Sequence, residues 1–387
     1  MNGTCYQVNL QTGWGGGEVY TKFFTRALDA IGIRTVLFAA EAAIGRWREQ
    51  LPPGTTVVGI SGPDALAAAL ASYLPVGGRG WLVFQTPATA AQIAPLRAAG
   101  HLLTCFAHMP LYGRDPASLR PYDLVVPVSG HVLASLHAAG ITHTHDEPLY
   151  GVADLSARCG NRQLRRRSCY DWDRRKLRDR LFGVFEPAIE RLRPHPPFAR
   201  GDGIALGIVS RLTPIKQFPL LFSVLAPVLA RHPAFRLEVF GNGGYASVRD
   251  LRQALAPIRN RVRFWGQQAD VATAYRQLDY LLTGLPEKEA LGLNIIEAQA
   301  CGLPVIAVDA PPFTETVAGD VTGLFYTDPR NDNGVGFDTL LTRLAVKPFK
   351  PDPVAAAAHL QKFSTAAFAE RVVRLVAATA RLAGSGT

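Results

Sequence analysis

The sequence predicts an α/β protein with two domains, each built on a parallel sheet. Short apolar segments alternate with Ala-rich helical segments. Strands that alternate with helices of this length need crossover connections, and they form parallel sheets. The alternation stops at about residue 155 and starts again after residue 200, which indicates two separate sheets. The chain of 387 residues is long enough for two domains of ordinary size.

The first half of the chain contains a series of expected strands separated by helical segments. The segment VYTKFFTRALDAIG (19–32) is typical of a helix that ends at a glycine. The expected strands are CYQVNL (5–10), TVLFAA (35–40), GWLVFQ (80–85), HLLTCFAH (101–108) and YDLVVPVS (122–129).

The second half repeats this pattern after a connector. Its expected strands are IALGIVS (204–210), FRLEVFG (235–241), VRFWG (262–266), LDYLLTG (278–284) and PVIAVD (304–309), with helices at 218–232 and 248–258. We expect an N-terminal domain at 1–160, a basic connector at 161–200 and a C-terminal domain at 201–365. A final helix at 366–387 is expected to pack back on the N-terminal domain.

Composition limits where the protein works. The first residues lack a basic region followed by an apolar run, so we expect no signal peptide. The longest apolar segments are too short to cross a bilayer. The five cysteines are an odd number without paired metal-ligand spacing, which favours a reducing compartment. We therefore expect a cytoplasmic protein.

The net charge of +10 is concentrated in one block. Between Arg158 and Arg180 lie nine arginines and one lysine against three aspartates, a net charge of +7. The block has three possible interpretations. It is a solvated helix face, or it contacts an anionic membrane, which would place the protein on the inner face of the cell membrane, or it binds an acidic acceptor molecule. No nucleic acid is expected, because Tyr170 and Trp172 are the only interleaved aromatic residues.

The segment EKEALGLNIIEAQACGLPVIA (287–307) places carboxylates in apolar surroundings. A strand ends at Gly284, and the helix that follows ends at Gly302. Asn294 is a suitable N-cap, which puts Glu297 at capping-box spacing. Glu297 is therefore either a capping carboxylate or, at a helix start that attracts anions, an acceptor of hydrogen bonds from sugar hydroxyls.

Glu289 and Glu297 are separated by seven residues and followed by AQACGLPVI (298–306), and together they resemble the signature of the large retaining glycosyltransferase family 4, which has the GT-B fold. The resemblance continues at TETV (314–317) and VTGLF (321–325). It selects Glu289 rather than Glu287 as the partner of Glu297 and leaves Glu287 as a surface charge. It is strong over 204–326, weaker over 1–154 and absent over 155–200.

The resemblance implies two Rossmann-like domains that face each other across a cleft, the first binding the acceptor and the second the nucleotide sugar. It assigns Glu289 to the donor sugar and Glu297 to the ribose. It places Arg211 and Lys216 on the donor pyrophosphate, although by themselves both would be read as surface charges. Gln217 departs from the family, which has a small residue after the lysine.

The resemblance also implies further donor contacts, for which plain turns and strand ends are the alternatives. They are Gly241 and Gly243 in the loop GNGG, Gln267 after the strand VRFWG, and the residues Ala290, Leu291, Gly292 and Leu293 before the helix start.

In the first domain, the run Gly15, Gly16 and Gly17 follows the first strand and allows close approach of a ligand to the backbone. The resemblance places this loop over the donor phosphates and the acceptor, and Glu18 is expected to cap the helix. His108 ends a strand where the family has a histidine facing the transferred sugar. The alternative is a histidine with a purely structural role.

We expect no metal and no cofactor, with the nucleotide sugar as co-substrate. The segment Asp171-Trp172-Asp173 mimics an Asp-x-Asp metal motif, but it precedes a helical segment and is more typical of a cap. His143 and His145 have no evident third ligand.

The sequence thus predicts a retaining, metal-independent glycosyltransferase. It would move a sugar from a UDP- or GDP-sugar to a hydroxyl of a carbohydrate, lipid-linked or other acceptor, in the assembly of a bacterial surface polysaccharide or glycolipid. One alternative is a nucleotide-sugar epimerase of the same fold, which would consume the donor without an acceptor. Another is a non-catalytic basic binder of membranes or nucleic acid, with salt-sensitive binding and no affinity for nucleotides.

Overall fold

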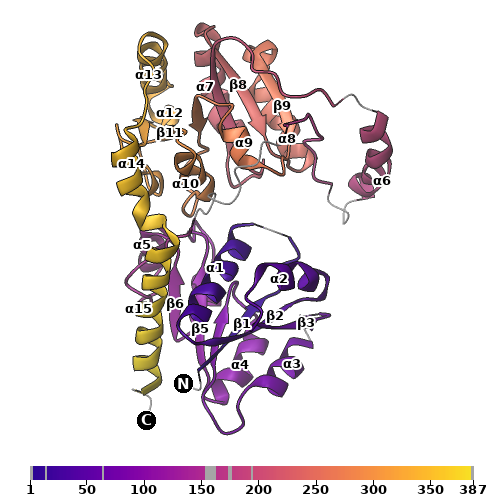
Figure 1. Cartoon of the computed structure of the whole chain (residues 1–387), viewed down its shortest axis with the longest axis vertical. Helices are drawn as coiled ribbons and strands as arrows, with labels where there is room; N and C mark the ends of the chain where they lie inside the picture. Colours follow the sequence, from indigo (N-terminus) through magenta and orange to yellow (C-terminus); the bar gives the residue numbers. More distant parts are fainter. Residues whose placement is uncertain are drawn as a thin grey trace. The chain divides into compact units, whose positions relative to one another are not determined.

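The computed structural model describes residues 3–13, 15–62, 65–152, 163–172, 177–192 and 195–384. The chain divides into two compact units (Figure 1). Unit 1 comprises Met1–Val152 together with Gln361–Thr387, and unit 2 comprises Ala153–Leu360. Residues 161–200, expected as a separate connector, are assigned to unit 2, and the C-terminal helix is assigned to unit 1.

Unit 1 contains a six-stranded parallel sheet in the order β3-β2-β1-β4-β5-β6. Its strands are β1 (Thr4–Asn9), β2 (Arg34–Ala40), β3 (Thr56–Ile60), β4 (Trp81–Phe84), β5 (Leu102–Ala107) and β6 (Leu124–Pro127). Its helices are α1 (Gly16–Ala30), α2 (Ile44–Gln50), α3 (Ala65–Tyr73), α4 (Ala90–Ala98), α5 (Gly130–Ala138) and α15 (Thr365–Gly384), with single 3₁₀ turns at Glu41–Ala43, Pro116–Ser118 and Gln361–Phe363.

Unit 2 repeats this topology in the order β12-β11-β10-β7-β8-β9. Its strands are β7 (Ile204–Val209), β8 (Phe235–Phe240), β9 (Val262–Gly266), β10 (Tyr280–Leu282), β11 (Val305–Val308) and β12 (Gly323–Tyr326). Its helices are α6 (Leu177–Leu192), α7 (Phe218–Arg231), α8 (Tyr245–Ala254), α9 (Val271–Tyr275), α10 (Leu293–Ala300), α11 (Phe313–Thr316), α12 (Pro329–Asp332), α13 (Val335–Val346) and α14 (Pro353–Leu360), with a 3₁₀ segment at Ala256–Arg261.

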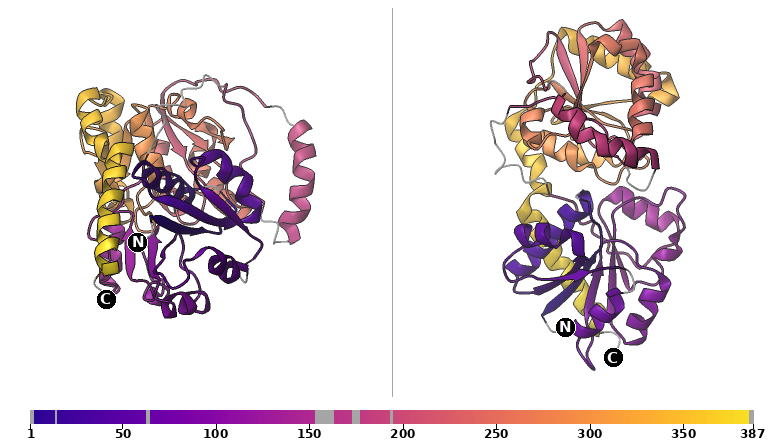
Figure 2. Two further views of the ribbon diagram at one scale, coloured as in Figure 1. Left: turned by 60° about the horizontal axis from the view of Figure 1, so that its bottom comes forward. Right: turned by 90° about the vertical axis from the view of Figure 1, so that its right-hand side faces the viewer.

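The predicted fold of two parallel-sheet units is confirmed. Helices flank both sheets (Figure 2), which is why most strands are buried on both faces. In each sheet the strand order reverses at one point, between β1 and β4 in unit 1 and between β7 and β10 in unit 2. Ligands of such sheets bind at the carboxyl ends of the strands beside this reversal. We therefore expect ligand-binding residues in the loops after β1, β4, β7 and β10.

The helix α15 packs against α1 within unit 1. The ring of Phe368 lies 6.2 Å from that of Tyr20 and 6.4 Å from that of Phe23, in edge-on geometry. On its outer side, Arg374 forms a two-pronged ion pair with Glu147, with distances of 2.6 and 2.8 Å. No helix in the described part of the chain combines the length and the apolar composition needed to cross a membrane.

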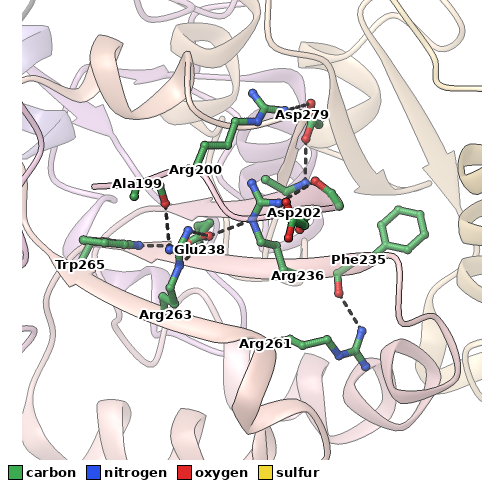
Figure 3. Close-up of polar contacts among 12 residues, drawn as sticks. Ala199, Arg200, Asp202, Phe235, Arg236, Glu238, Arg261, Arg263, Trp265 and Asp279 are labelled. Carbon is green, nitrogen blue, oxygen red and sulfur yellow. Dashed lines mark hydrogen bonds and ion pairs between the residues drawn. The ribbon is translucent and has the colours of Figure 1, made fainter. Parts of the chain in front are cut away.

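A buried carboxylate on β8 links this strand to the edge strand β9 of the unit 2 sheet (Figure 3). The side chain of Glu238 on β8 is fully buried. It accepts hydrogen bonds from Arg236 Nε at 3.1 Å, from Arg263 Nε at 3.0 Å and from Trp265 Nε1 at 2.6 Å. The two arginines also bond the segment that precedes β7. Arg263 donates to the carbonyl of Ala199, and Arg236 donates to the carbonyl of Gly203. Glu238 therefore ties the connector to β8 and β9.

Replacement of Glu238 by alanine leaves two guanidinium groups near a cavity without their counter-charge. Breaking a buried ion pair from one side costs about 3–5 kcal/mol of the free energy of unfolding. We expect Glu238→Ala to show a loss of this size in denaturant unfolding followed by circular dichroism. Asp250→Ala is the control, because it removes an exposed ion pair with Arg249 and should cost less than about 1 kcal/mol. Equal losses in the two variants would contradict the role given to Glu238.

Candidate active site

Lys216 and Glu289 form an ion pair at the carboxyl edge of the unit 2 sheet. Lys216 lies in the loop after β7 and Glu289 in the loop after β10, the two strands beside the reversal of strand order. Both side chains are mostly buried, with exposed fractions of 19% and 13%. Burial raises the pKa of Glu289, but the charge and hydrogen bond of Lys216, with the N–H groups of Ala290 and Gly292, hold it below the usual range. Glu289 is therefore an ionised carboxylate.

Close contact between two backbones places Lys216 beside this carboxylate. A Cβ atom at Gly284 would lie 2.2 Å from the carbonyl oxygen of Lys216, so only glycine fits there. The N–H of Leu285 donates to the same oxygen at 3.3 Å. Gly284 thus brings the loops after β7 and β10 together.

Glu287 was expected as a surface charge, and this expectation is wrong. Its side chain is 23% exposed and pairs with Arg330. It also accepts a hydrogen bond from Gln217 Nε2 at 3.1 Å. Gln217 precedes α7 with a φ of 54°, a left-handed conformation. Gln217, where the sequence differs from the small residue of the family, is thus held by a hydrogen bond to Glu287.

Glu297 does not belong to a capping box. The N-cap of α10 is Gly292, with a φ of 82°, rather than Asn294. The left-handed conformation favours glycine and starts the helix two residues earlier than expected. Asn294 instead donates from Nδ2 to the carbonyl of Val209 at 3.2 Å, which joins α10 to the end of β7.

The partner of Glu297 is a buried tyrosine that the sequence did not reveal. Tyr275 at the end of α9 donates from its hydroxyl to Glu297 Oε2 at 3.0 Å. Burial and the Glu297 charge both raise the pKa of Tyr275 well above its ordinary value, so the hydroxyl stays a donor. This bond fixes the half-buried Glu297 carboxylate at the start of α10.

Gly241 and Gly243 have a packing role in the structure. Cβ atoms there would lie 1.8 Å from the carbonyl oxygen of Ser210 and 2.1 Å from that of Leu212. Their N–H groups are engaged, with Gly266 and with Cys169 of the connector. The two glycines therefore press the loop after β8 onto the chain around Arg211. Their contact with a donor stays a prediction.

Arg211 and Gln267 are both exposed. Within the described residues, no side chain bonds the guanidinium of Arg211. Gln267 follows β9, but its neighbour Gln268 makes the local hydrogen bonds, donating to the carbonyls of Arg165 and Trp265 at 2.9 and 2.8 Å. Ala290 and Leu291 are buried in the loop before α10, and Leu293 is its first residue.

In unit 1, the glycine run opens α1 as expected. Gly15 is the N-cap, Gly16 and Gly17 are the first helical residues, and Glu18 accepts a hydrogen bond from the Gly15 N–H at 2.7 Å. A Cβ atom at Gly17 would lie 3.9 Å from Cδ2 and Nε2 of His108. The start of α1 and the end of β5 therefore meet at the His108 ring.

A chain of neutral polar groups orients His108. Thr25 Oγ1 donates to the carbonyl of Thr21 at 2.8 Å and accepts from Gln7 Nε2 at 2.8 Å. The Gln7 Oε1 atom then faces Gln85 Nε2 at 3.4 Å, which leaves Gln85 Oε1 to accept from His108 Nε2 at 2.9 Å. In this arrangement Nε2 carries the proton and Nδ1 carries the lone pair.

Burial lowers the pKa of His108 to about 4, so the imidazole is neutral near pH 7. The ring is stacked on Phe106 with an interplanar angle of 13° and meets Tyr20 edge-on. Gln7 and Gln85 are buried. A glutamine within an apolar strand was visible in CYQVNL and GWLVFQ, and it is the signal that could have revealed this chain.

The described residues contain no group of three or more His, Cys, Asp or Glu side chains able to hold a metal ion. His143 bonds the carbonyl of Leu119 at 3.2 Å. Asp173 of the Asp-x-Asp segment lies outside the described residues.

Part of this chain is similar in sequence to known proteins. Residues 193–335 match the family model described as "Glycosyl transferases group 1". D-inositol 3-phosphate glycosyltransferase of Rhodococcus erythropolis is 32% identical over 174 residues, which are 42% of this chain and 38% of that protein. The GDP-mannose-dependent monoacylated alpha-(1-6)-phosphatidylinositol monomannoside mannosyltransferase of Corynebacterium glutamicum is 30% identical over 178 residues, 43% of this chain and 45% of that protein. The chain thus spans less than half the length of these relatives.

The crystal structure of Anabaena HepE in complex with UDP superposes on 97% of this chain and 100% of its own, with a TM-score of 0.67 at 18% identity. Identity this low shows a common fold. The chain therefore has the GT-B fold, and its residues 193–335 are similar to the glycosyl transferases group 1 family.

Proposed function

We propose that the protein is a retaining glycosyltransferase that transfers a sugar from a UDP- or GDP-sugar to an acceptor hydroxyl. The observation that carries this proposal is the buried pair of Lys216 and Glu289 at the reversal of strand order in unit 2. A nucleotide sugar presents a diphosphate and a ring of hydroxyls. A fixed ammonium beside a fixed carboxylate suits both groups at adjacent positions.

The diphosphate is assigned to Lys216 and Arg211. The leaving nucleoside diphosphate gains negative charge as the glycosidic bond breaks, and a preorganised cation lowers the energy of that state. Lys216 is held in place before the donor arrives, while the exposed Arg211 can reach an incoming phosphate. In this proposal the protein's own cations stabilise the charge, and the reaction needs neither a bound metal nor a cofactor.

The sugar and the ribose are assigned to the two carboxylates. Glu289 is ionised and mostly buried, so it accepts hydrogen bonds from hydroxyls of the transferred sugar. Glu297, which accepts a hydrogen bond from the Tyr275 hydroxyl at the start of α10, is assigned to the ribose. The loop of Ala290, Leu291, Gly292 and Leu293 joins these carboxylates and shapes the space between them.

In unit 1, we assign His108 to a hydroxyl of the sugar substrate and the run from Gly15 to Gly17 to close backbone approach. The neutral imidazole with its lone pair on Nδ1 accepts a hydrogen bond and adds no charge. For retention, the departing phosphate takes the acceptor proton on the same face of the sugar, so no separate base is assigned.

The acceptor is assigned to the class of carbohydrates and lipid-linked sugars of bacterial surfaces. Support comes from the names of the relatives, one of which acts on a phosphatidylinositol mannoside with GDP-mannose, and from the UDP bound in HepE.

Removal of either partner of the buried pair should strongly reduce the rate of transfer. We expect Lys216→Ala and Glu289→Ala to lower kcat by about 10²–10³-fold, the loss seen when one preorganised transition-state contact is removed. The measurement is formation of glycosylated product from a panel of UDP- and GDP-sugars with saccharide and lipid-linked acceptors.

Glu287→Gln is the matched control, because this residue lies two positions away and pairs with Gln217 and Arg330 instead. It should keep kcat within a few-fold of the wild type. Full activity of the Lys216 and Glu289 variants would refute the assignment. Donor converted to an isomeric nucleotide sugar without acceptor would show an epimerase.

The tautomer of His108 gives a second test. In ¹⁵N spectra of the labelled protein, we expect Nε2 protonated and Nδ1 unprotonated at pH 7, with titration only near pH 4. Because the unfolded chain binds this proton at about pH 6.5, stability conferred by the neutral ring is complete above that pH and is lost as the pH falls toward 4.

Gln85→Leu should remove the preference for one tautomer and leave the partly exposed His137 unchanged. A pKa of His108 near 6.5, or a proton on Nδ1 in the wild type, would contradict the chain of neutral groups.

A further inference from the structure

The helix α6 turns an apolar stripe toward solvent. Leu177, Val184, Phe185 and Leu192 are 67%, 70%, 61% and 86% exposed. Their spacing places them on one side of the helix, two turns apart along its length. In Figure 1 and the left view of Figure 2, α6 stands clear of the strands and other helices of unit 2.

The opposite side of α6 is acidic and faces the protein. Asp179 is 3% exposed, and Glu186 accepts a hydrogen bond from the Ser168 hydroxyl. Between them, a Cβ atom at Gly183 would lie 3.3 Å from Trp172 Cβ. Asp179, Gly183 and Glu186 are spaced four and three residues apart, so they lie on the same side of the helix. The helix is therefore docked through its polar side, the reverse of an ordinary surface helix, which buries its apolar face.

Positive charge lines one edge of the outward stripe. Arg180 and Arg191 are exposed on α6, eleven residues apart and thus on one edge of the apolar face. Arg165, Arg166 and Arg167 are exposed on the connector segment that precedes the helix. Further arginines of the basic block lie at 158–162 and 173–176, outside the described residues.

We propose that the apolar stripe of α6 and the exposed arginines along its edge form a docking surface for an anionic lipid bilayer. A helix with bulky apolar residues on one side and arginines at its border lies in the membrane interface, with the apolar side among the acyl chains and the cations at the headgroups. Because Asp179 and Glu186 face the protein, their negative charges lie away from the side that would meet anionic lipids.

A bilayer explains these features better than a protein partner does. The apolar stripe is a single helix wide, and the described charges at its border are all positive. This inference does not depend on the enzymatic activity, because it predicts binding of the resting protein to lipid.

Binding of the full chain to vesicles tests the proposal. We expect flotation with vesicles that contain phosphatidylglycerol, little flotation with pure phosphatidylcholine, and release by salt. The double variant Val184→Ser, Phe185→Ser should bind about tenfold more weakly or worse, because it removes the inserted groups. Its thermal unfolding should match the wild type, since both side chains are exposed.

The matched control is Val346→Ser, Val354→Ser, which removes valines that are 84% and 79% exposed on α13 and α14. It should bind vesicles like the wild type. Arg180→Gln, Arg191→Gln should weaken binding to anionic vesicles. Absence of binding by the wild type, or equal binding by wild type and the α6 double variant, would overturn the proposal. A change in oligomeric state of the α6 variant without any lipid binding would show a protein interface instead.

Discussion

The candidate site depends on close contact between backbones at glycine positions. Gly284 admits the carbonyl of Lys216, while Gly241 and Gly243 admit those of Ser210 and Leu212. Any side chain at these positions would push apart the loops after β7, β8 and β10. The contacts hold the chain around Arg211 and Lys216 in one place, and the Lys216–Glu289 pair forms as a result.

The two units prepare their polar groups by different physical means. Unit 2 buries an ion pair, in which each charge compensates for the desolvation of the other. Unit 1 buries a chain of neutral groups, from Thr25 through Gln7 and Gln85 to His108. Amide chains carry no net charge, so they fix the orientation of a ring with a small desolvation cost. The buried charged pair thus lies in unit 2, the unit that we assign to the charged nucleotide-sugar donor.

The fold was predictable from sequence because apolar runs and helix periodicity are local signals. The resemblance selected Lys216 and Glu289 as donor-binding residues, but neither the resemblance nor a local signal predicted that the two side chains form an ion pair. Contacts between distant residues were missed, among them Gln217 with Glu287 and Gln7 with Gln85. The start of α10 was misplaced because Asn294 has the better capping chemistry, whereas the left-handed backbone at Gly292 decides where the helix begins. The docking of the connector on Gly243 gave no sequence signal either, since it uses backbone groups.

In the function that we propose, unit 2 binds the diphosphate of a nucleotide sugar at Lys216 and Arg211. Isothermal titration calorimetry of the wild type with UDP, GDP, ADP and their sugar conjugates tests it most directly. We expect saturable binding of at least one nucleotide, weakened by Lys216→Ala together with Arg211→Ala and unaffected by Glu287→Gln. Absence of binding for the whole panel, or binding that survives loss of both cations, would contradict it.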